Sequence, residues 1–210
     1  DFAPIAVVGT NPFVLVVNKD VPAKNVTEFI AWVKASPTTM SYAEGSLGSV
    51  THLAMALFLK RAGLNMTNVS YRGNAPALTD IVAGHLPTMF SNLSDALPHI
   101  RAGGFRALAV TSETRSAELP DVPTMIEAGV PDYVVTSFFG LAAPAGLDPA
   151  IVVTLNGALN EALKAADVQQ SFTKFGADTK IATPQEFAAL ISSEFRKWSA
   201  VAKINPMNLD

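Results

Sequence analysis

The chain has 210 residues, of which 49% are apolar and only 16% are charged, and its formal net charge is -3 at pH 7. A length of this order allows one large domain or two of about 100 residues each, and the apolar content indicates a large buried core. The slight acidic excess, without any basic cluster, argues against nucleic acid or an anionic membrane as the main partner. The chain contains no cysteine, which excludes disulfides, thiolate nucleophiles and cysteine-based zinc sites.

Apolar runs in the sequence are too broken to cross a membrane. A spanning helix needs about 18 or more consecutive apolar residues, and the longest uncharged stretch, 2–18, is interrupted by Pro4, Gly9 and Pro12. We therefore expect no membrane insertion. The chain opens at Asp1 inside a strand-like pattern and shows no signal peptide, so we expect a fragment or a processed product.

Short β-branched runs alternate with segments of helical period over the first two-thirds of the chain. This alternation predicts βαβ units and a mostly parallel sheet covered by helices. The expected strands are 6–8, 13–17, 40–43, 68–71, 88–90 and 106–110. The expected helices are 27–35, 49–62, 76–83 and 95–102, with Thr27 as a first-helix N-cap, Pro76 at a first helical position, and Gly63, Gly84 and Gly103 as terminating glycines.

The pattern changes after residue 118. A strand is expected at 134–141, followed by helices at 149–165, 168–175 and 184–202, with no convincing strand between them. Helices without strands of their own must cover a sheet that is formed elsewhere. The sequence therefore predicts a domain boundary near 131–138.

The segment from Tyr42 to His52 is the most informative one for function. A strand end passes there through Gly and Ser residues into an amphipathic helix, so the unpaired N–H groups and the positive dipole end of the helix face the turn. A carboxylate or phosphate fits such a place. The alternative is that Ser46 or Ser49 only caps the helix. No lysine follows the glycines, so the segment is not a Walker A loop.

Two further turns, 71–76 and 90–93, also follow predicted strands and carry Tyr, Gly, Asn and Ser residues. Ligands of open parallel sheets gather at the C-terminal ends of the strands. The three turns together predict a polar and largely uncharged pocket. Arg72 either pairs there with an anion or is only solvated.

Signs of catalysis are weak. None of the histidines, His52, His85 and His99, has a carboxylate or a second histidine at metal-ligand spacing. A triad of Ser46, His52 and Asp80 can be assembled on paper, but the surrounding residues lack the nucleophile-elbow pattern. We favour His52 as a structural hydrogen-bonding residue, and we expect no enzyme, no metal and no cofactor.

Six blocks of this sequence, in this order, resemble the Bug-type substrate-binding proteins of tripartite tricarboxylate transporters. The blocks are 42–53, 71–80, 96–103, 119–124, 127–131 and 139–146, and the likeness extends from residue 1 to about residue 198. The resemblance implies an α/β, type II periplasmic-binding-protein fold in which two lobes enclose a cleft. It further implies that 1–133 form the second lobe, that 134–210 form a mainly helical return into the first lobe, and that the first lobe lacks its N-terminal part.

The resemblance also implies a binding site and partners. In this family backbone amides, hydroxyls and ordered water hold the ligand's carboxylates. Carried over to this chain, one carboxylate is bound by Ser46, Leu47, Gly48 and Ser49, and the cleft is lined by Tyr71, Gly73, Asn74, Ser91 and Asn92. The family often has Asp where this chain has Ser91.

The function that follows is a periplasmic receptor that delivers a small organic acid, or a related metabolite, to membrane permease subunits. Alternatives are a solute-sensing module that feeds a signalling partner and, third, a serine hydrolase. For an incomplete first lobe we expect weak ligand binding and self-association through the exposed apolar face.

Overall fold

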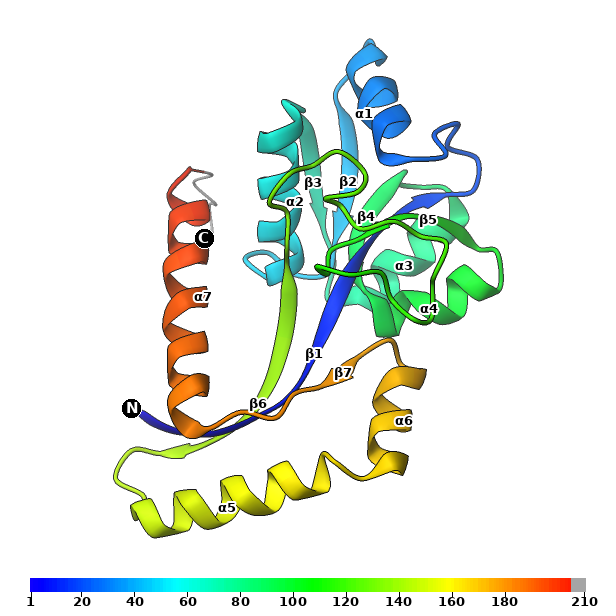
Figure 1. The fold of residues 1–210 in the computed structure, drawn as a ribbon. Coiled ribbons are helices and arrows are strands. Elements are labelled where there is room, and N and C mark those ends of the chain that lie inside the picture. Colours follow the sequence, from blue (N-terminus) through cyan, green and yellow to red (C-terminus); the bar gives the residue numbers. More distant parts are fainter. Residues whose placement is uncertain (205–210) are drawn as a thin grey trace.

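The computed structural model describes residues 1–204 and contains strands and helices in mixed order (Figure 1). The strands are β1 (Phe2–Asn18), β2 (Met40–Glu44), β3 (Met66–Ser70), β4 (Thr88–Asn92), β5 (Phe105–Val110), β6 (Thr136–Pro144) and β7 (Asp178–Thr179). The helices are α1 (Val26–Ala35), α2 (Val50–Ala62), α3 (Asn74–Ala83), α4 (Leu93–Arg101), α5 (Pro149–Ala162), α6 (Ala166–Lys174) and α7 (Pro184–Ile204).

β1 is a single strand of 17 residues, where the sequence predicted two short ones. From Phe13 onward it lies between β4 and β5, and before Phe13 it pairs with β6 and, over two residues, with β7. Gly9 and Pro12 interrupt the local strand pattern, but pairing with β6 on a distant part of the chain overrides that local signal. The register with β6 shifts twice, between Pro4 and Ala6 and between Val7 and Gly9.

The prediction of a mostly parallel sheet is wrong for its central strand. β1 is antiparallel to both β4 and β5. These two strands, which α4 connects, therefore run in the same direction as each other. Among the strands of the described residues 1–204, only β2 and β3 pair in parallel, and a single parallel bridge joins Val110 to Thr124. The alternation of strands and helices correctly describes the connections, but it contains no information about a strand that enters from another part of the chain.

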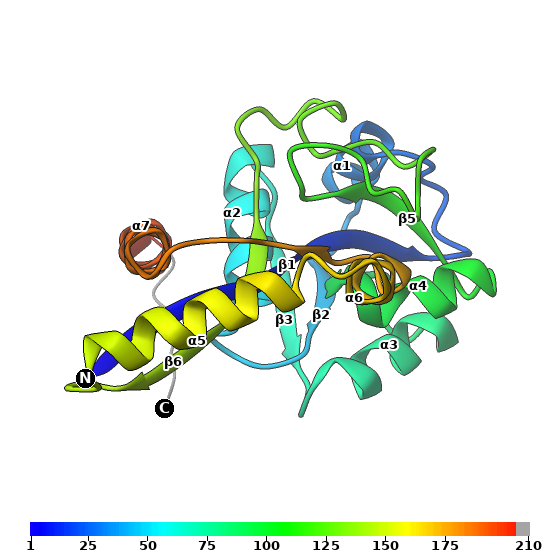
Figure 2. The same ribbon diagram turned by 60° about the horizontal axis from the view of Figure 1, so that its bottom comes forward.

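The C-terminal segment packs around the first part of β1. Figure 2 shows α5 running along the ribbon formed by β1 and β6, with α7 seen end-on beside it. Both helices contact β1, and the ring of Phe187 from α7 covers Gly140, where a Cβ would lie 2.3 Å from the ring. Residues 2–12 therefore lie with the segment after residue 133, and the division of the chain at residue 133 stays a prediction.

Helix ends follow the sequence signals with small shifts. Asn25, and not Thr27, caps α1, because its side chain accepts a hydrogen bond from the Glu28 N–H. α3 begins at Asn74, two residues before the predicted Pro76. The terminating glycines Gly63, Gly84 and Gly103 all have positive φ, which glycine adopts without a steric penalty. No helix among residues 1–204 has the length and apolarity needed to cross a bilayer.

An aromatic cluster forms the centre of the largest core. Phe58 of α2 makes edge-to-face contacts with Phe90 of β4 and with Tyr133, at ring-centroid distances of 6.0 and 6.4 Å. The Tyr133 hydroxyl donates to the Ala54 carbonyl at 2.7 Å, and burial raises the pKa of this phenol well above its usual range. Tyr133 is therefore an uncharged core residue that attaches the segment before β6 to α2.

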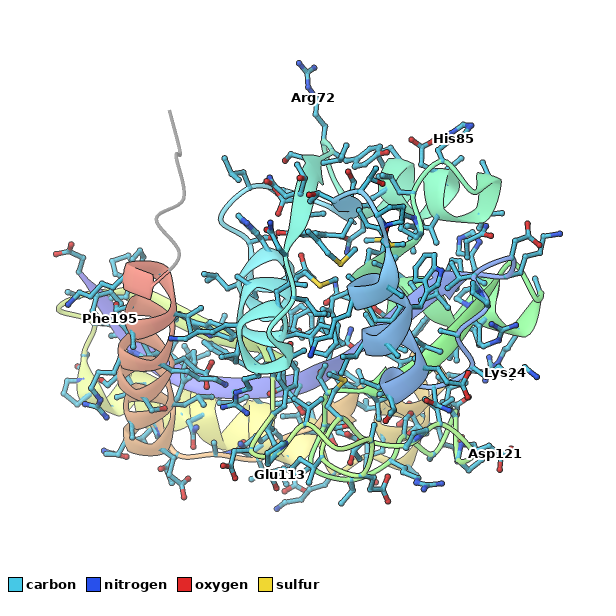
Figure 3. The ribbon with its side chains drawn as sticks, turned by 90° about the horizontal axis from the view of Figure 1, so that it is seen from above. Lys24, Arg72, His85, Glu113, Asp121 and Phe195 are labelled. Atoms are coloured by element: carbon cyan, nitrogen blue, oxygen red, sulfur yellow. The ribbon has the colours of Figure 1, made fainter. Side chains whose placement is uncertain are left out.

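We expect Phe58→Ala to lower the free energy of unfolding by about 3–5 kcal/mol, because it removes a ring from a fully buried site and leaves a cavity. Phe195→Ala is the matched control, since this ring is 73% exposed on α7 (Figure 3), and we expect it to change stability by no more than about 0.5 kcal/mol. Urea unfolding measures both. Similar losses in the two variants would contradict this description of the core.

Candidate functional site

A pocket of about 400 Å³ lies where the turns after β2, β3 and β4 approach β1 and β6. Its volume falls in the range of about 300–1,000 Å³ that is usual for small-molecule sites. It is lined by Phe13, Gly45, Ser46, Ser49, Val50, Thr51, Gly73, Asn74, Asn92, Ser137 and Phe139. The two phenylalanine rings and Val50 supply its apolar surface, and none of the described side chains that line it is charged.

Three helices begin at this pocket. Ser49, Gly73 and Asn92 are the N-cap residues of α2, α3 and α4, and all three line the pocket. Gly73 and Asn92 provide no side-chain capping hydrogen bond, so the first N–H groups of their helices stay open to a ligand. Three positive dipole ends therefore converge on an uncharged cavity, which favours an anion.

The N-terminus of α2 leaves backbone donors unused. The Ser49 Oγ accepts from the His52 N–H at 3.3 Å, and the Ser49 carbonyl accepts from the Leu53 N–H at 3.0 Å. In the described part of the chain, the N–H groups of Val50 and Thr51 have no acceptor. Ser49 therefore caps the helix, as the alternative interpretation of the sequence proposed, and the remaining donors are still available to a carboxylate.

Two glycines allow the neighbouring turns to meet. The Gly73 N–H donates to the Gly45 carbonyl at 2.6 Å, and Gly73 has a φ of 113°, which side chains rarely tolerate. A Cβ on Gly45 would lie 2.2 Å from Oδ1 of Asn74 and 3.1 Å from its backbone nitrogen. The close approach of these turns thus requires glycine at both positions.

Asp95 distinguishes α4 from the other two helices. It lies in the first turn of α4, and its Oδ2 accepts from the side-chain amides of Asn74 at 2.8 Å and Asn92 at 3.3 Å. An acid in this position compensates the positive end of its own helix. The N-termini of α2 and α3 are therefore the ones available to an incoming anion, and Asp95 holds the two amides that border them.

Five of the residues predicted for the site line this pocket: Ser46, Ser49, Gly73, Asn74 and Asn92. The other four lie near it without lining it. Leu47 and Gly48 are exposed on the turn before α2, and Ser91 is fully buried, with its Oγ donating to the Asn92 carbonyl at 3.2 Å.

Tyr71 faces Asp80 on α3, to which its hydroxyl donates a hydrogen bond. Burial and this bond raise the pKa of Tyr71 to about 12, and the same bond, with a smaller contribution from His85, lowers the pKa of Asp80. Tyr71 is therefore an uncharged donor that is already occupied. Arg72 extends away from the molecule into solvent (Figure 3), as in the solvated alternative.

Sequence reasoning missed part of the pocket wall. Gly45 is one of the glycines of the predicted turn, and Val50 and Thr51 directly follow it, so their proximity to the turn is a usable signal. Phe13, Ser137 and Phe139 come from β1 and β6, and they reach the pocket only through strand pairing. No local sequence pattern indicates that such residues reach the pocket.

The catalytic triad of Ser46, His52 and Asp80 that was considered from the sequence does not form. Asp80 bonds to Tyr71 and His85, whereas Nδ1 of His52 lies 3.1 Å from the Gly48 nitrogen and 3.2 Å from Oε2 of Glu44. His52 is thus a hydrogen-bonding residue beneath the turn. Among the residues that the structure describes, no group of three His, Cys, Asp or Glu side chains is arranged to hold a metal ion.

The chain belongs to the tripartite tricarboxylate transporter family receptors (TctC), whose family profile matches residues 1–208. Protein BugT of Bordetella pertussis is 38% identical over 203 residues, which are 97% of this chain and 62% of BugT. The chain therefore spans less than two-thirds of the length of that relative. The predicted membership of the Bug-type receptors is confirmed.

Solved structures show the same fold. R. palustris Rpa4515 with adipate is 33% identical, with a TM-score of 0.91 over 99% of this chain and 69% of that chain. MatC from Rhodopseudomonas palustris with bound malate is 32% identical, with a TM-score of 0.84 over 95% of this chain and 69% of that chain. The α/β periplasmic-binding-protein fold expected from the sequence is thereby confirmed.

We expect Gly45→Ala to lower the free energy of unfolding by about 1–3 kcal/mol, the usual range for an added methyl group in a closely packed place, because the new Cβ displaces Asn74. Gly157→Ala is the matched control. It lies inside α5, where a Cβ meets nothing within 4 Å, and we expect a gain of about 0.5–1 kcal/mol. Urea unfolding separates the two, and equal effects would contradict the close contact between the turns.

Proposed function

We propose that this chain forms part of a periplasmic receptor that binds a small organic acid in the pocket at the N-termini of α2, α3 and α4. The receptor then presents the acid to the membrane permease of a tripartite tricarboxylate transporter. Binding takes place without chemical change to the ligand. The observation that carries the proposal is the convergence of three helix N-termini on a pocket without charged side chains.

Energetics favour a carboxylate in this place. A helix N-terminus contributes about 0.3–1 kcal/mol, and up to about 2 kcal/mol when partly buried, and each hydrogen bond to a charged group about 1.5–3 kcal/mol. We assign one carboxylate to the hydroxyls of Ser46 and Ser49 and to the backbone N–H groups of Val50 and Thr51. Gly73, Asn74 and Asn92 position the rest of the ligand.

The remaining predicted residues have indirect roles in this proposal. Leu47 and Gly48 shape the turn before α2, Ser91 fills the space behind Asn92, and Tyr71 holds α3 through Asp80. The relatives solved with adipate and with malate carry dicarboxylates, and two open helix N-termini suit a ligand with two anionic groups. We therefore propose a dicarboxylate, and use malate and adipate as probes.

We expect Ser46→Asp to weaken the binding of malate and adipate on the order of 100-fold. A carboxylate about 5 Å from the ligand's own carboxylate costs about 3 kcal/mol at an effective dielectric constant of 20. Two-dimensional NMR titration of the chain measures this loss, and also detects weak binding. Ser171→Asp, an equal charge on an exposed position of α6, is the control and retains the affinity. Unchanged binding in Ser46→Asp would place the ligand elsewhere.

We also propose that a second copy of the chain covers the exposed apolar side chains of its C-terminal segment and of the strands paired with it. These side chains are Phe2, Leu141, Ile151, Val153, Leu155, Phe175 and Ile181. Exposed apolar side chains of this kind favour association.

Light scattering over a range of concentrations tests this self-association. We expect the average mass to rise with concentration, and to rise less in Val153→Asp, which places a charge on the exposed face of α5. A constant monomer mass at every concentration would contradict the proposal.

A further inference from the structure

Two phenylalanine rings form the strand side of the pocket. Phe13 on β1 and Phe139 on β6 both line it, and each lies two residues beyond the paired residues Asn11 and Ser137 of its strand. Phe13 is 2% exposed and belongs to the core, whereas Phe139 is 52% exposed. A ring that keeps half of its surface in water gains free energy when an apolar group covers it.

The alternation of side chains along β6 holds Phe139 on the pocket side. Ser137 and Phe139 lie on one face of the strand, and Phe138 between them lies on the other, where its ring contacts the ring of Phe187 at a centroid distance of 5.9 Å. Gly140 also faces Phe187, since a Cβ there would lie 2.3 Å from that ring. Packing on the opposite face of β6 therefore fixes the direction of the Phe139 ring.

The hydroxyl of Ser137, which lines the same pocket, is already engaged. It donates to the Asn11 carbonyl at 3.0 Å, so its single proton is used. Val50, the first residue of α2, adds a further apolar side chain to the lining. Phe13, Val50 and Phe139 therefore offer a ligand contact area and no hydrogen bonds.

Donors for the acid groups of a ligand lie at the turns, which form the other part of the lining. The backbone N–H groups of Val50 and Thr51 at the start of α2, and of Asn74 at the start of α3, have no acceptor in the described part of the chain. The side-chain amide of Asn74 donates to Asp95. The open donors are therefore backbone groups at two helix N-termini, where anions bind well.

We propose that the pocket selects a dicarboxylate whose carbon skeleton carries no hydroxyl groups, and that Phe139 is the residue that determines this specificity. The inference deepens the proposed function and rests on the pocket assigned there. The two acid groups bind at the N-termini of α2 and α3, and the carbon atoms between them cover the rings of Phe13 and Phe139.

Hydroxyl groups on the ligand's skeleton oppose this arrangement. A hydroxyl that lies against the rings loses its water and finds no acceptor on them, which lowers the affinity about fivefold or more for each such group. A methylene group in the same place raises the affinity, by up to about fourfold when it is fully buried. Hydroxylation of the skeleton is therefore the ligand property to which this part of the pocket responds.

Two pairs of acids isolate this property. Adipate and galactarate have the same carbon chain and the same terminal carboxylates, but galactarate carries a hydroxyl on each inner carbon. Succinate and malate are likewise equal in chain length and differ by a single hydroxyl. Within each pair the charge and the length stay constant, so a difference in affinity reports how the pocket receives the skeleton.

NMR titration of the chain with each of these acids tests the selection. We expect adipate to bind at least about tenfold more tightly than galactarate, and succinate about fivefold more tightly than malate. Equal affinities within both pairs, or tighter binding of the hydroxylated acids, would overturn the inference.

Phe139→Ala tests the role of the ring itself. We expect the affinity for adipate to fall on the order of tenfold and that for galactarate to change less than about threefold, whereas Phe139→Leu, which keeps an apolar side chain, retains most of the preference. Phe195→Ala is the matched control, because it removes a ring that is 73% exposed on α7 (Figure 3), and it leaves both affinities unchanged. An unchanged preference for adipate in Phe139→Ala would overturn the assignment of specificity to this residue.

The same titrations separate the inference from the proposed function. If none of these acids shifts a resonance, the assigned pocket and its selection of an apolar skeleton are both rejected. If the acids bind and Ser46→Asp weakens them, but adipate has no advantage over galactarate, the pocket stands and the selection alone is rejected.

Discussion

The pairing of β1 is the constraint on which the rest of the structure depends. The second part of this uninterrupted strand lies between β4 and β5. Its first part pairs with β6 and forms a ribbon with it. Phe13, at the junction, lines the pocket. Thr111 closes this junction from the other side, because its hydroxyl accepts from the Phe13 N–H at 2.8 Å and contacts the Val135 carbonyl. The pocket lies at this place because both parts of the fold share β1.

The chemistry of the pocket comes from backbone groups that the fold leaves unpaired. Helices α2, α3 and α4 each follow a strand whose C-terminal end reaches the same region, so their open N–H groups face one cavity. Asp95 compensates α4 and holds Asn74 and Asn92, which leaves the other two N-termini available to an anion. The proposed binding of an organic acid therefore needs no arginine, in agreement with Arg72 pointing into solvent (Figure 3).

Beneath this pocket lie a buried carboxyl group and a buried imidazole, 3.2 Å apart. Glu44 and His52 are placed there by the end of β2 and the first turn of α2, the same elements that form the turn.

The sequence by itself determined most of the elements, the family and the turn before α2. Helix and strand periods, the terminating Gly63 and Gly84, and the Gly and Ser residues of 45–49 are local signals, because each depends on the backbone of a few neighbouring residues. Five of the nine predicted site residues line the pocket for this reason: they belong to turns that open helices.

Only the tertiary structure decided the direction of β1, the apolar wall of the pocket and the meeting of Glu44 with His52. β1 is antiparallel to β4 and β5, which lie far away in the chain. The residue pattern of a strand does not indicate which strand it pairs with, or in which direction. Phe13 and Phe139 reach one cavity through the same pairing. Tyr71 does not line the pocket, because Asp80 on α3 accepts a hydrogen bond from its hydroxyl. Contacts of this kind are decided by how the segments pack, which the spacing of residues in the sequence does not show.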